Sequence, residues 1–205
     1  AMVLLADDAY VFMVMWELMA LSSFFLVTAN HVIPEIRRAG YLYLLIAHIG
    51  ALAILLCFGV LQANTGDYTF ANMRAQELTP FWASVAFLLA FFGFGAKAGI
   101  VPLHIWLPEA HPAAPSPVSA LMSGVMLKTA IYGLLRIGFE VLQLQLAWWG
   151  VLALVRGLVT ALFGVVFSAI QSDMKRLLAY SSIENIGLLL VAMGLAWLFS
   201  AYGMS

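Results

Sequence analysis

The chain has 205 residues, of which 64% are hydrophobic and 9% are charged, and its formal net charge is -1. A soluble domain is about 45–50% apolar and about 25% charged, so this composition excludes a soluble globular protein and indicates a membrane protein. No basic arm or patch suggests nucleic-acid binding, and a single cysteine, Cys57, excludes an internal disulfide and a cysteine-ligated cluster.

Long, continuous apolar segments predict an all-α fold, a polytopic bundle of about six transmembrane helices. Each segment has roughly the 20 residues that a helix needs to cross about 30 Å of hydrocarbon. The predicted spans are Tyr10–Ala29, Tyr41–Leu61, Phe81–Val101, Val118–Phe139, Ala147–Ile170 and Leu177–Phe199.

Basic residues in the connecting loops predict the orientation. Arg37 and Arg38 follow the first span, and Lys175 and Arg176 precede the sixth. The bias of Lys and Arg toward cytoplasmic loops predicts that the first, third and fifth loops face the cytoplasm from the cell's inner membrane. The N-terminus lacks the basic region of a cleavable signal peptide, and we expect the chain to be a fragment of a longer membrane domain.

The first two spans each contain an ionisable residue. Glu17 lies within FMVMWELMALSSFFLV, far from any other charge in the sequence. A lone carboxylate at the centre of a span costs about 2.5–3.5 kcal/mol on insertion scales, so a functional role is favoured over a tolerated surface position. His48 in the second span fits a hydrogen-bonded structural residue and a proton relay equally well, because imidazole exchanges protons near neutral pH.

The third span contains a lysine beside residues that weaken a helix. Lys97 lies among three glycines and before a proline: Gly93, Gly95, Gly99 and Pro102. The helix is predicted to break at Gly95, Gly99 and Pro102, and such breaks line polar cavities in transporters. Glycines also allow close helix packing, but packing does not explain the lysine. Glu17 is its predicted partner, because a nearby opposite charge keeps a lysine ionised.

Lys128 lies in the middle of the fourth span and is interpreted as a second functional cation. The segment before it, from Pro102 to Pro117, holds five of the seven prolines and is predicted to be irregular and stiff. His104 and His111 in this segment are interpreted as loop or vestibule residues, because the prolines prevent a regular helical histidine pair.

Arg156 falls inside the fifth predicted span and has no evident partner. Either it pairs with an acid or the helix begins later than the hydropathy indicates. No catalytic triad, phosphate-binding loop or metal-ligand set is present. The sequence therefore predicts no cofactor, no metal, and no redox or catalytic centre in this chain.

Three stretches resemble the antiporter-type membrane subunits of respiratory complex I, Mrp antiporters and energy-converting hydrogenases. They are WELMALSSFFLV around Glu17, AKAGIVPLHIWLPEAHPAAPSPVSALMSGVMLKTAIYG around Lys97 and Lys128, and QSDMKRLLAYSSIENIGLL in the last third. The resemblance covers essentially the whole chain. It is strongest to hydrogenase-4 component B and the formate hydrogenlyase membrane subunit, because complex I subunits usually carry another pair in place of Glu184 and Asn185.

The resemblance implies a fold of two inverted repeats with about fourteen helices, in which residues 1–205 correspond to helices five to ten. It implies that Glu17 pairs with Lys97 on a broken helix and that Lys128 carries protons towards the centre. A further ionisable residue is expected on a second broken helix beyond Ser205.

The implied function is proton translocation by a non-catalytic subunit of a hydrogenase-type oxidoreductase complex related to complex I. The implied partners are other membrane subunits, peripheral hydrogenase and iron-sulfur subunits, the lipid bilayer and protons. Two alternatives stay open: a cation/proton antiporter subunit of the Mrp type, and a structural membrane anchor for the complex.

Overall fold

The computed structural model describes residues 2–62 and 66–203. The helices in these ranges form an all-α bundle. Six helical spans in the described residues are long and apolar enough to cross a membrane: Ala9–Val27, Pro34–Gln62, Pro80–Ala113, Ser116–Val141, Ala147–Ala169 and Met174–Ala201. The predicted fold class and all six predicted spans are confirmed.

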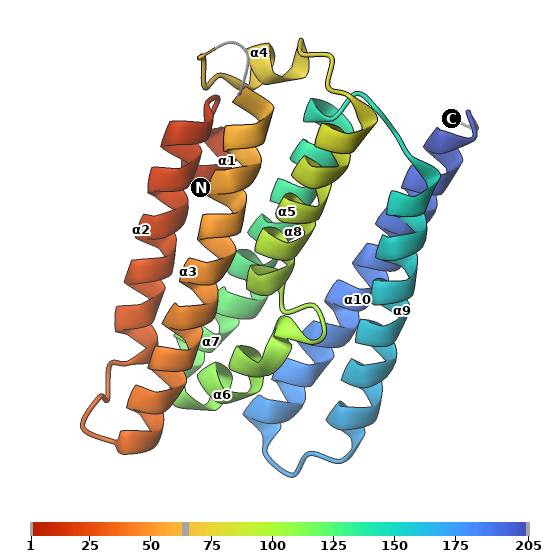
Figure 1. Cartoon of the computed structure of the whole chain (residues 1–205). Coiled ribbons are helices and arrows are strands. Elements are labelled where there is room, and N and C mark those ends of the chain that lie inside the picture. The colour runs from red at the N-terminus through yellow and green to blue at the C-terminus, as the bar shows by residue number, and fades with distance from the viewer. Residues whose placement is uncertain (1, 63–65, 204–205) are drawn as a thin grey trace.

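The spans pack side by side in one bundle (Figure 1). Helices α2 (Ala9–Val27) and α3 (Pro34–Gln62) form one side, α5 (Pro80–Ala98) and α8 (Leu127–Leu135) the middle, and α9 (Ala147–Ala169) and α10 (Met174–Ala201) the other side. The shorter elements are α1 (Met2–Leu5), α4 (Phe70–Arg74), a 3₁₀ turn η1 (Leu103–Ile105), α6 (Trp106–Ala113), α7 (Ser116–Leu121) and two π-helical segments, η2 (Met122–Met126) and η3 (Arg136–Val141).

Local sequence signals set where the helices begin. Asp8 caps α2 by accepting a hydrogen bond from the Val11 amide at 2.7 Å, and Asp173 caps α10 by accepting one from Arg176 at 2.9 Å. Pro80 is the first residue of α5, where an amide hydrogen would have no partner within the helix. Helices α3 and α10 begin before their predicted spans, because their first turns carry polar residues that hydropathy does not count.

Aromatic side chains fill the interior on both sides of α5. The rings of Phe87 and Trp149 stack with centroids 4.5 Å apart, and those of Phe139 and Trp197 stack at 4.9 Å. On the other side, Phe94 packs edge-on against Trp16 at 5.4 Å. The contacts of Phe87 and Phe94 hold α5 between its neighbours.

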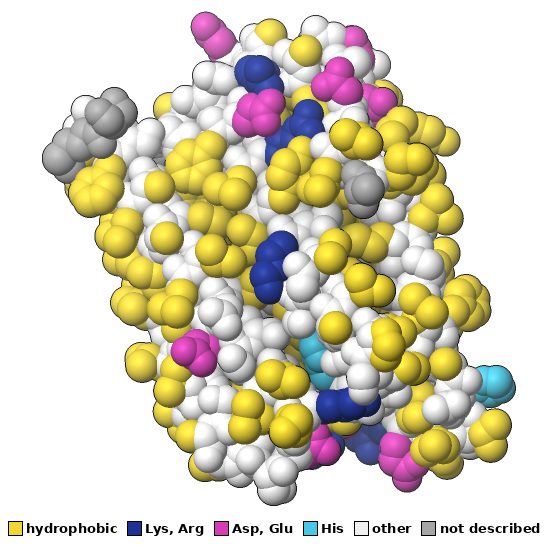
Figure 2. Space-filling view, turned by 180° about the vertical axis from the view of Figure 1, so that it is seen from behind, with side chains coloured by type: hydrophobic (Ala, Val, Ile, Leu, Met, Phe, Trp, Pro, Cys, Tyr) yellow, Lys and Arg dark blue, Asp and Glu magenta, His cyan; other side chains and the backbone are white. Residues whose placement is uncertain are grey.

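Most charged side chains on the face in Figure 2 lie toward the two ends of the bundle, and hydrophobic side chains spread across the middle, where a basic side chain is also visible. Ion pairs stand at these ends, Arg74 with Glu140 and Arg136 with Asp7 at one, and Arg176 with Glu109 at the other. This distribution is the one expected of a protein whose middle faces hydrocarbon.

The prediction of an irregular segment between Pro102 and Pro117 is wrong. Most of it is helical: η1, α6 and the start of α7 follow one another with short breaks. Pro108 is the third residue of α6, where the missing amide hydrogen leaves no bond unmade. Only Pro112 lies inside the helix, near its end. The prolines therefore set the helix ends rather than prevent helices.

Candidate functional site

A helix break is present near Lys97, at the end of α5; it lies at Gly99 and Pro102, whereas Gly95 is still within the helix. Gly99 has φ 82°, a left-handed conformation that favours glycine, and caps the helix. A methyl group added there would stand 2.1 Å from Leu107 Cδ1, so the close approach of α6 also requires glycine. The carbonyl of Gly95 accepts hydrogen bonds from Gly99 and Ile100, at 2.9 and 3.0 Å, which closes the last turn.

Contacts from other elements hold the broken end in place. Trp106 of α6 donates its indole N–H to the carbonyl of Ala96 at 2.9 Å. The amide of Val101, beyond the break, donates to Thr160 Oγ1 of α9 at 3.2 Å. Pro102 has no amide hydrogen and follows directly. The backbone groups that the break frees are therefore partly satisfied by α6 and α9, as irregular backbone at membrane depth requires.

Lys97 lies in the last turn of α5 with only 2% of its surface exposed. Its Nζ donates to the hydroxyl of Tyr43 on α3 at 2.6 Å and lies 4.6 Å from the centroid of the same ring. The Tyr43 hydroxyl is 2.5 Å from Ser23 Oγ on α2, and Ser23 Oγ in turn donates to the Met19 carbonyl at 2.7 Å. An ammonium group can only donate, so the Tyr43 hydroxyl accepts from Lys97 and donates its own hydrogen bond to Ser23.

This polar chain joins three helices around one buried charge. A neutral hydroxyl and a ring face stabilise the ammonium group, in place of the predicted carboxylate. Sequence reasoning missed Tyr43 and Ser23. A signal was available, since a tyrosine hydroxyl in the middle of a span needs a hydrogen-bond partner.

The predicted direct pairing of Glu17 with Lys97 is not formed. The carboxylate of Glu17 instead faces His48, with Oε2 and Nε2 3.7 Å apart. Both side chains are partly exposed, at 32% and 47%, in a groove of 560 Å³ on the outer face of α2 and α3. Trp16, Ala20 and Ser23 occupy the buried face of α2, and that geometry turns Glu17 away from Lys97.

The second ring nitrogen of His48 fixes how this pair can hold a proton. Nδ1 lies 3.0 Å from the carbonyl of Leu44, which can only accept, so Nδ1 carries the hydrogen. In a neutral ring, Nε2 then faces Glu17 as an acceptor. With the hydrogen on Nδ1 in place, the pair has no net charge when it holds one further proton, on either the Glu17 carboxylate or Nε2.

Lys128 is exposed on the outside of the described chain, at the start of α8. Its Nζ donates to the carbonyl of Ser123 at 2.5 Å. Ser123 belongs to η2, and π-helical segments of this kind are frequent at functional sites. The lysine therefore reaches back along its own helix toward α7.

A polar pocket of 430 Å³ lies between α6, α7 and α10, and Ser123 lines it. His111 is buried beside it with Nδ1 2.6 Å from Ser119 Oγ, and Nε2 has no hydrogen-bond partner in the described structure. Lys175 closes the pocket by donating to the Ala114 carbonyl at 2.7 Å. His111 is thus a buried helical residue rather than the predicted loop residue, while His104 packs on the ring of Phe163.

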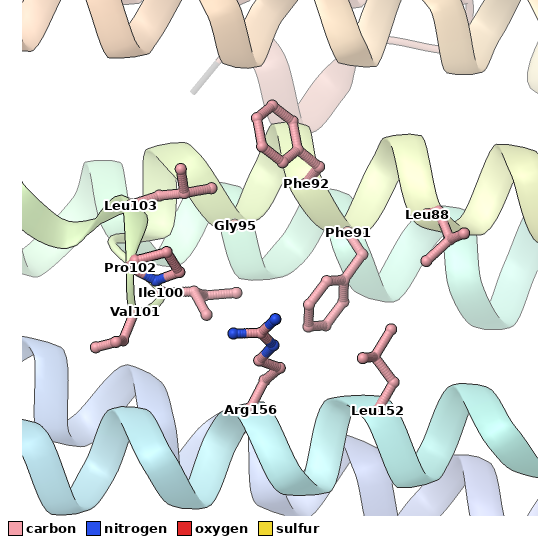
Figure 3. Close-up of a pocket in the computed structure, with 10 residues that line it drawn as sticks. All are labelled: Leu88, Phe91, Phe92, Gly95, Ile100, Val101, Pro102, Leu103, Leu152 and Arg156. Carbon is pink, nitrogen blue, oxygen red and sulfur yellow. The ribbon is translucent and has the colours of Figure 1, made fainter.

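Arg156 lies inside α9, which begins at Ala147, so a later helix start is excluded. Its guanidinium points into a pocket of 330 Å³ between α5 and α9 (Figure 3). Leu88, Phe91 and Leu152 line one part of this pocket, and the broken end of α5 lines the other.

The residues described by the structure contain no group of three or more His, Cys, Asp or Glu side chains that could hold a metal ion. The arrangement instead offers separate groups that bind protons at membrane depth: Lys97 in its polar chain, Glu17 with His48, and Lys128 beside a polar pocket. Such groups can take up and release protons.

The chain is similar to known membrane proteins. Residues 6–204 match the family described as NADH:quinone oxidoreductase/Mrp antiporter, TM. Hydrogenase-4 component B of Escherichia coli is 50% identical over 94% of this chain and 29% of its own length. Formate hydrogenlyase subunit 3 of the same organism is 36% identical over 93% of this chain and 30% of its own length.

Among solved structures, a chain of the Mrp complex from Dietzia sp. superimposes with a TM-score of 0.87 and 33% sequence identity. The match covers 94% of this chain and 21% of that chain. The chain therefore spans less than a third of the length of each of these three relatives.

Proposed function

This chain belongs to the NADH:quinone oxidoreductase/Mrp antiporter transmembrane family, and from that premise we propose that it translocates protons as part of a membrane subunit in a hydrogenase-type, energy-converting complex. Its 50% identity to hydrogenase-4 component B supports the hydrogenase branch. We also propose that the chain lies in the inner membrane. Its proposed partners are other membrane subunits and peripheral hydrogenase and iron-sulfur subunits. The correspondence of the six spans to helices five to ten of the family fold belongs to the same proposal.

The burial of Lys97 is the observation that carries the proposal. Lys97 has 2% exposure at a helix break, and its ammonium group is stabilised by the hydroxyl and the ring face of Tyr43, a contact that a neighbouring helix can alter. Charge movement elsewhere in the complex changes the protonation of Glu17 and His48. The resulting shift of α2 acts on Lys97 through Ser23 and Tyr43. This indirect coupling takes the place of a direct Glu17–Lys97 pair.

Release of the proton from Lys97 then passes charge through water to Lys128 and onward. The polar pocket around Ser123 and His111 supplies hydroxyl and imidazole groups close to Lys128. The pocket lies at the end of the bundle that carries Arg37, Lys175 and Arg176, and these basic residues predict that this end faces the cytoplasm. It is therefore suited to take up protons from the cytoplasmic side.

Replacing Lys97 with Met tests the role of the buried charge. Methionine is unbranched and similar in length, so we expect the complex to assemble while pumping in inverted membrane vesicles is abolished. Arg38→Met, which removes an exposed cation at the end of the bundle, is the matched control and should leave pumping unchanged. Full pumping by an assembled Lys97→Met complex would refute the proposal.

A sodium-coupled antiporter is the second candidate, because the superposition on the Mrp complex is close. Proton movement that depends on sodium in vesicles would favour it over the hydrogenase branch. A structural anchor is the third candidate. It predicts normal proton gradients after Glu17→Gln or Lys128→Met, whereas translocation predicts their loss.

A further inference from the structure

We propose that Arg156 binds a carboxylate carried by another membrane-embedded helix, which closes the groove between α5 and α9. This interaction site goes beyond the proposed proton route and does not rest on it.

Depth comes first. Arg156 stands nine residues after Ala147 and thirteen before Ala169, which places it about 14 Å and about 20 Å from the two ends of α9. Half of the hydrocarbon thickness is about 15 Å, so the arginine starts near the centre of the membrane. A phospholipid phosphate lies outside the hydrocarbon and would have to move deep inside it to reach this position.

The described residues 2–62 and 66–203 provide no counter-charge. None of their hydrogen bonds or ion pairs involves the Arg156 guanidinium. Glu35, Glu109 and Glu140 lie near the ends of their spans. Of the acids deeper in the spans, Glu17 faces His48, and Glu184 packs against Gly164, about 12 Å along α9. A guanidinium group has five donors and cannot lose its proton in a protein, so it must find acceptors outside these residues.

The groove offers space but few acceptors. Its volume is 330 Å³, and the side chains around the guanidinium are apolar, with Phe91, Ile100 and Leu152 among them (Figure 3). A helix that presents one acidic side chain fits both features, because its apolar surface covers the groove and its carboxylate accepts two parallel hydrogen bonds from the arginine fork. Relatives of this chain are more than three times as long or part of larger complexes, so further membrane helices are at hand in such assemblies.

A photo-crosslinking amino acid at Leu152 tests the contact while Arg156 stays intact. Leu152 lines the same groove one turn away, and Leu158, which is 47% exposed on the opposite face of α9, is the matched control position. In the native membrane complex we expect the adduct from Leu152 to map to a membrane-spanning segment with an Asp or Glu. The adduct from Leu158 should map to lipid.

Charge substitutions then measure the pair itself. Arg156→Gln should weaken retention of the mapped segment in the solubilised complex by about threefold to thirtyfold, whereas Arg156→Lys should retain part of it. Arg156→Glu combined with the mapped acid changed to Arg should restore retention. Adducts from Leu152 with lipid alone, with a segment lacking an acid, or unchanged retention in Arg156→Gln would each overturn the proposal.

Discussion

The most informative single substitution is Tyr43→Phe, because it removes one oxygen atom from the centre of the polar chain. The ring that packs against Trp106, tilted and with centroids 5.0 Å apart, is kept, so packing changes little. The hydroxyl that accepts from Lys97 Nζ at 2.6 Å is lost, and the lysine stays enclosed. The variant therefore isolates the hydrogen bond to the buried charge.

The size of the effect follows from what each partner keeps. Ser23 retains its bonds to the carbonyls of Met19 and Ala20, at 2.7 and 2.9 Å, so its contribution is small. Lys97 is the charged partner in the lost hydrogen bond, and a hydrogen bond that involves a charged group is worth about 1.5–3 kcal/mol. We expect Tyr43→Phe to lower the free energy of unfolding by about 2 kcal/mol, a factor of about 30 in the folding equilibrium.

Unfolding by a denaturing detergent, followed by circular dichroism, measures this change in the purified complex. Tyr41→Phe is the control, because Tyr41 lies on the same helix, is 67% exposed and should change stability very little. In a double-mutant cycle with Lys97→Met, the Tyr43 effect should shrink by about 2 kcal/mol. If the two substitutions were additive, the hydroxyl would not act through Lys97 and the reasoning would be refuted.

Two further substitutions probe the helix break. Gly99→Ala should cost at least about 1–2 kcal/mol of unfolding free energy from the left-handed backbone alone, and more from the clash with Leu107, while Gly59→Ala, with no atom within 4 Å, should be neutral or stabilising. Thr160→Val should cost about 1–3 kcal/mol because the Val101 amide loses its acceptor, and Thr160→Ser should restore most of it; equal stability of the Val and Ser variants would contradict this role. The same detergent titration measures both.

The break in α5 shows how far local sequence reasoning reaches. Glycine and proline act on their own backbone, so Gly99 and Pro102 predict the end of the helix without knowledge of its neighbours. The proline-rich segment that follows misled the same reasoning. Whether a proline breaks a helix depends on its place within it, and Pro108 falls in a first turn that only the end of α5 defines.

Arg156 marks a second limit. Hydropathy placed it within a span, and the helix start at Ala147 confirms this. The sequence could not say that its guanidinium would enter a groove beside the broken helix. That position depends on how α9 rotates against α5, which the contacts of Trp149 and Thr160 determine.

The amino-acid sequence by itself determined the six spans, the broken helix and the ionisable residues at membrane depth, because lipid imposes length and backbone hydrogen bonding on each helix separately. Only the tertiary structure decided which groups meet. Helix α2 is apolar on all sides, since both protein and lipid favour apolar side chains, so no periodic pattern reveals its buried face. Trp16 and Ala20 pack against the bundle, so the Glu17 side chain faces His48. Lys97 is left to form its hydrogen bond with Tyr43.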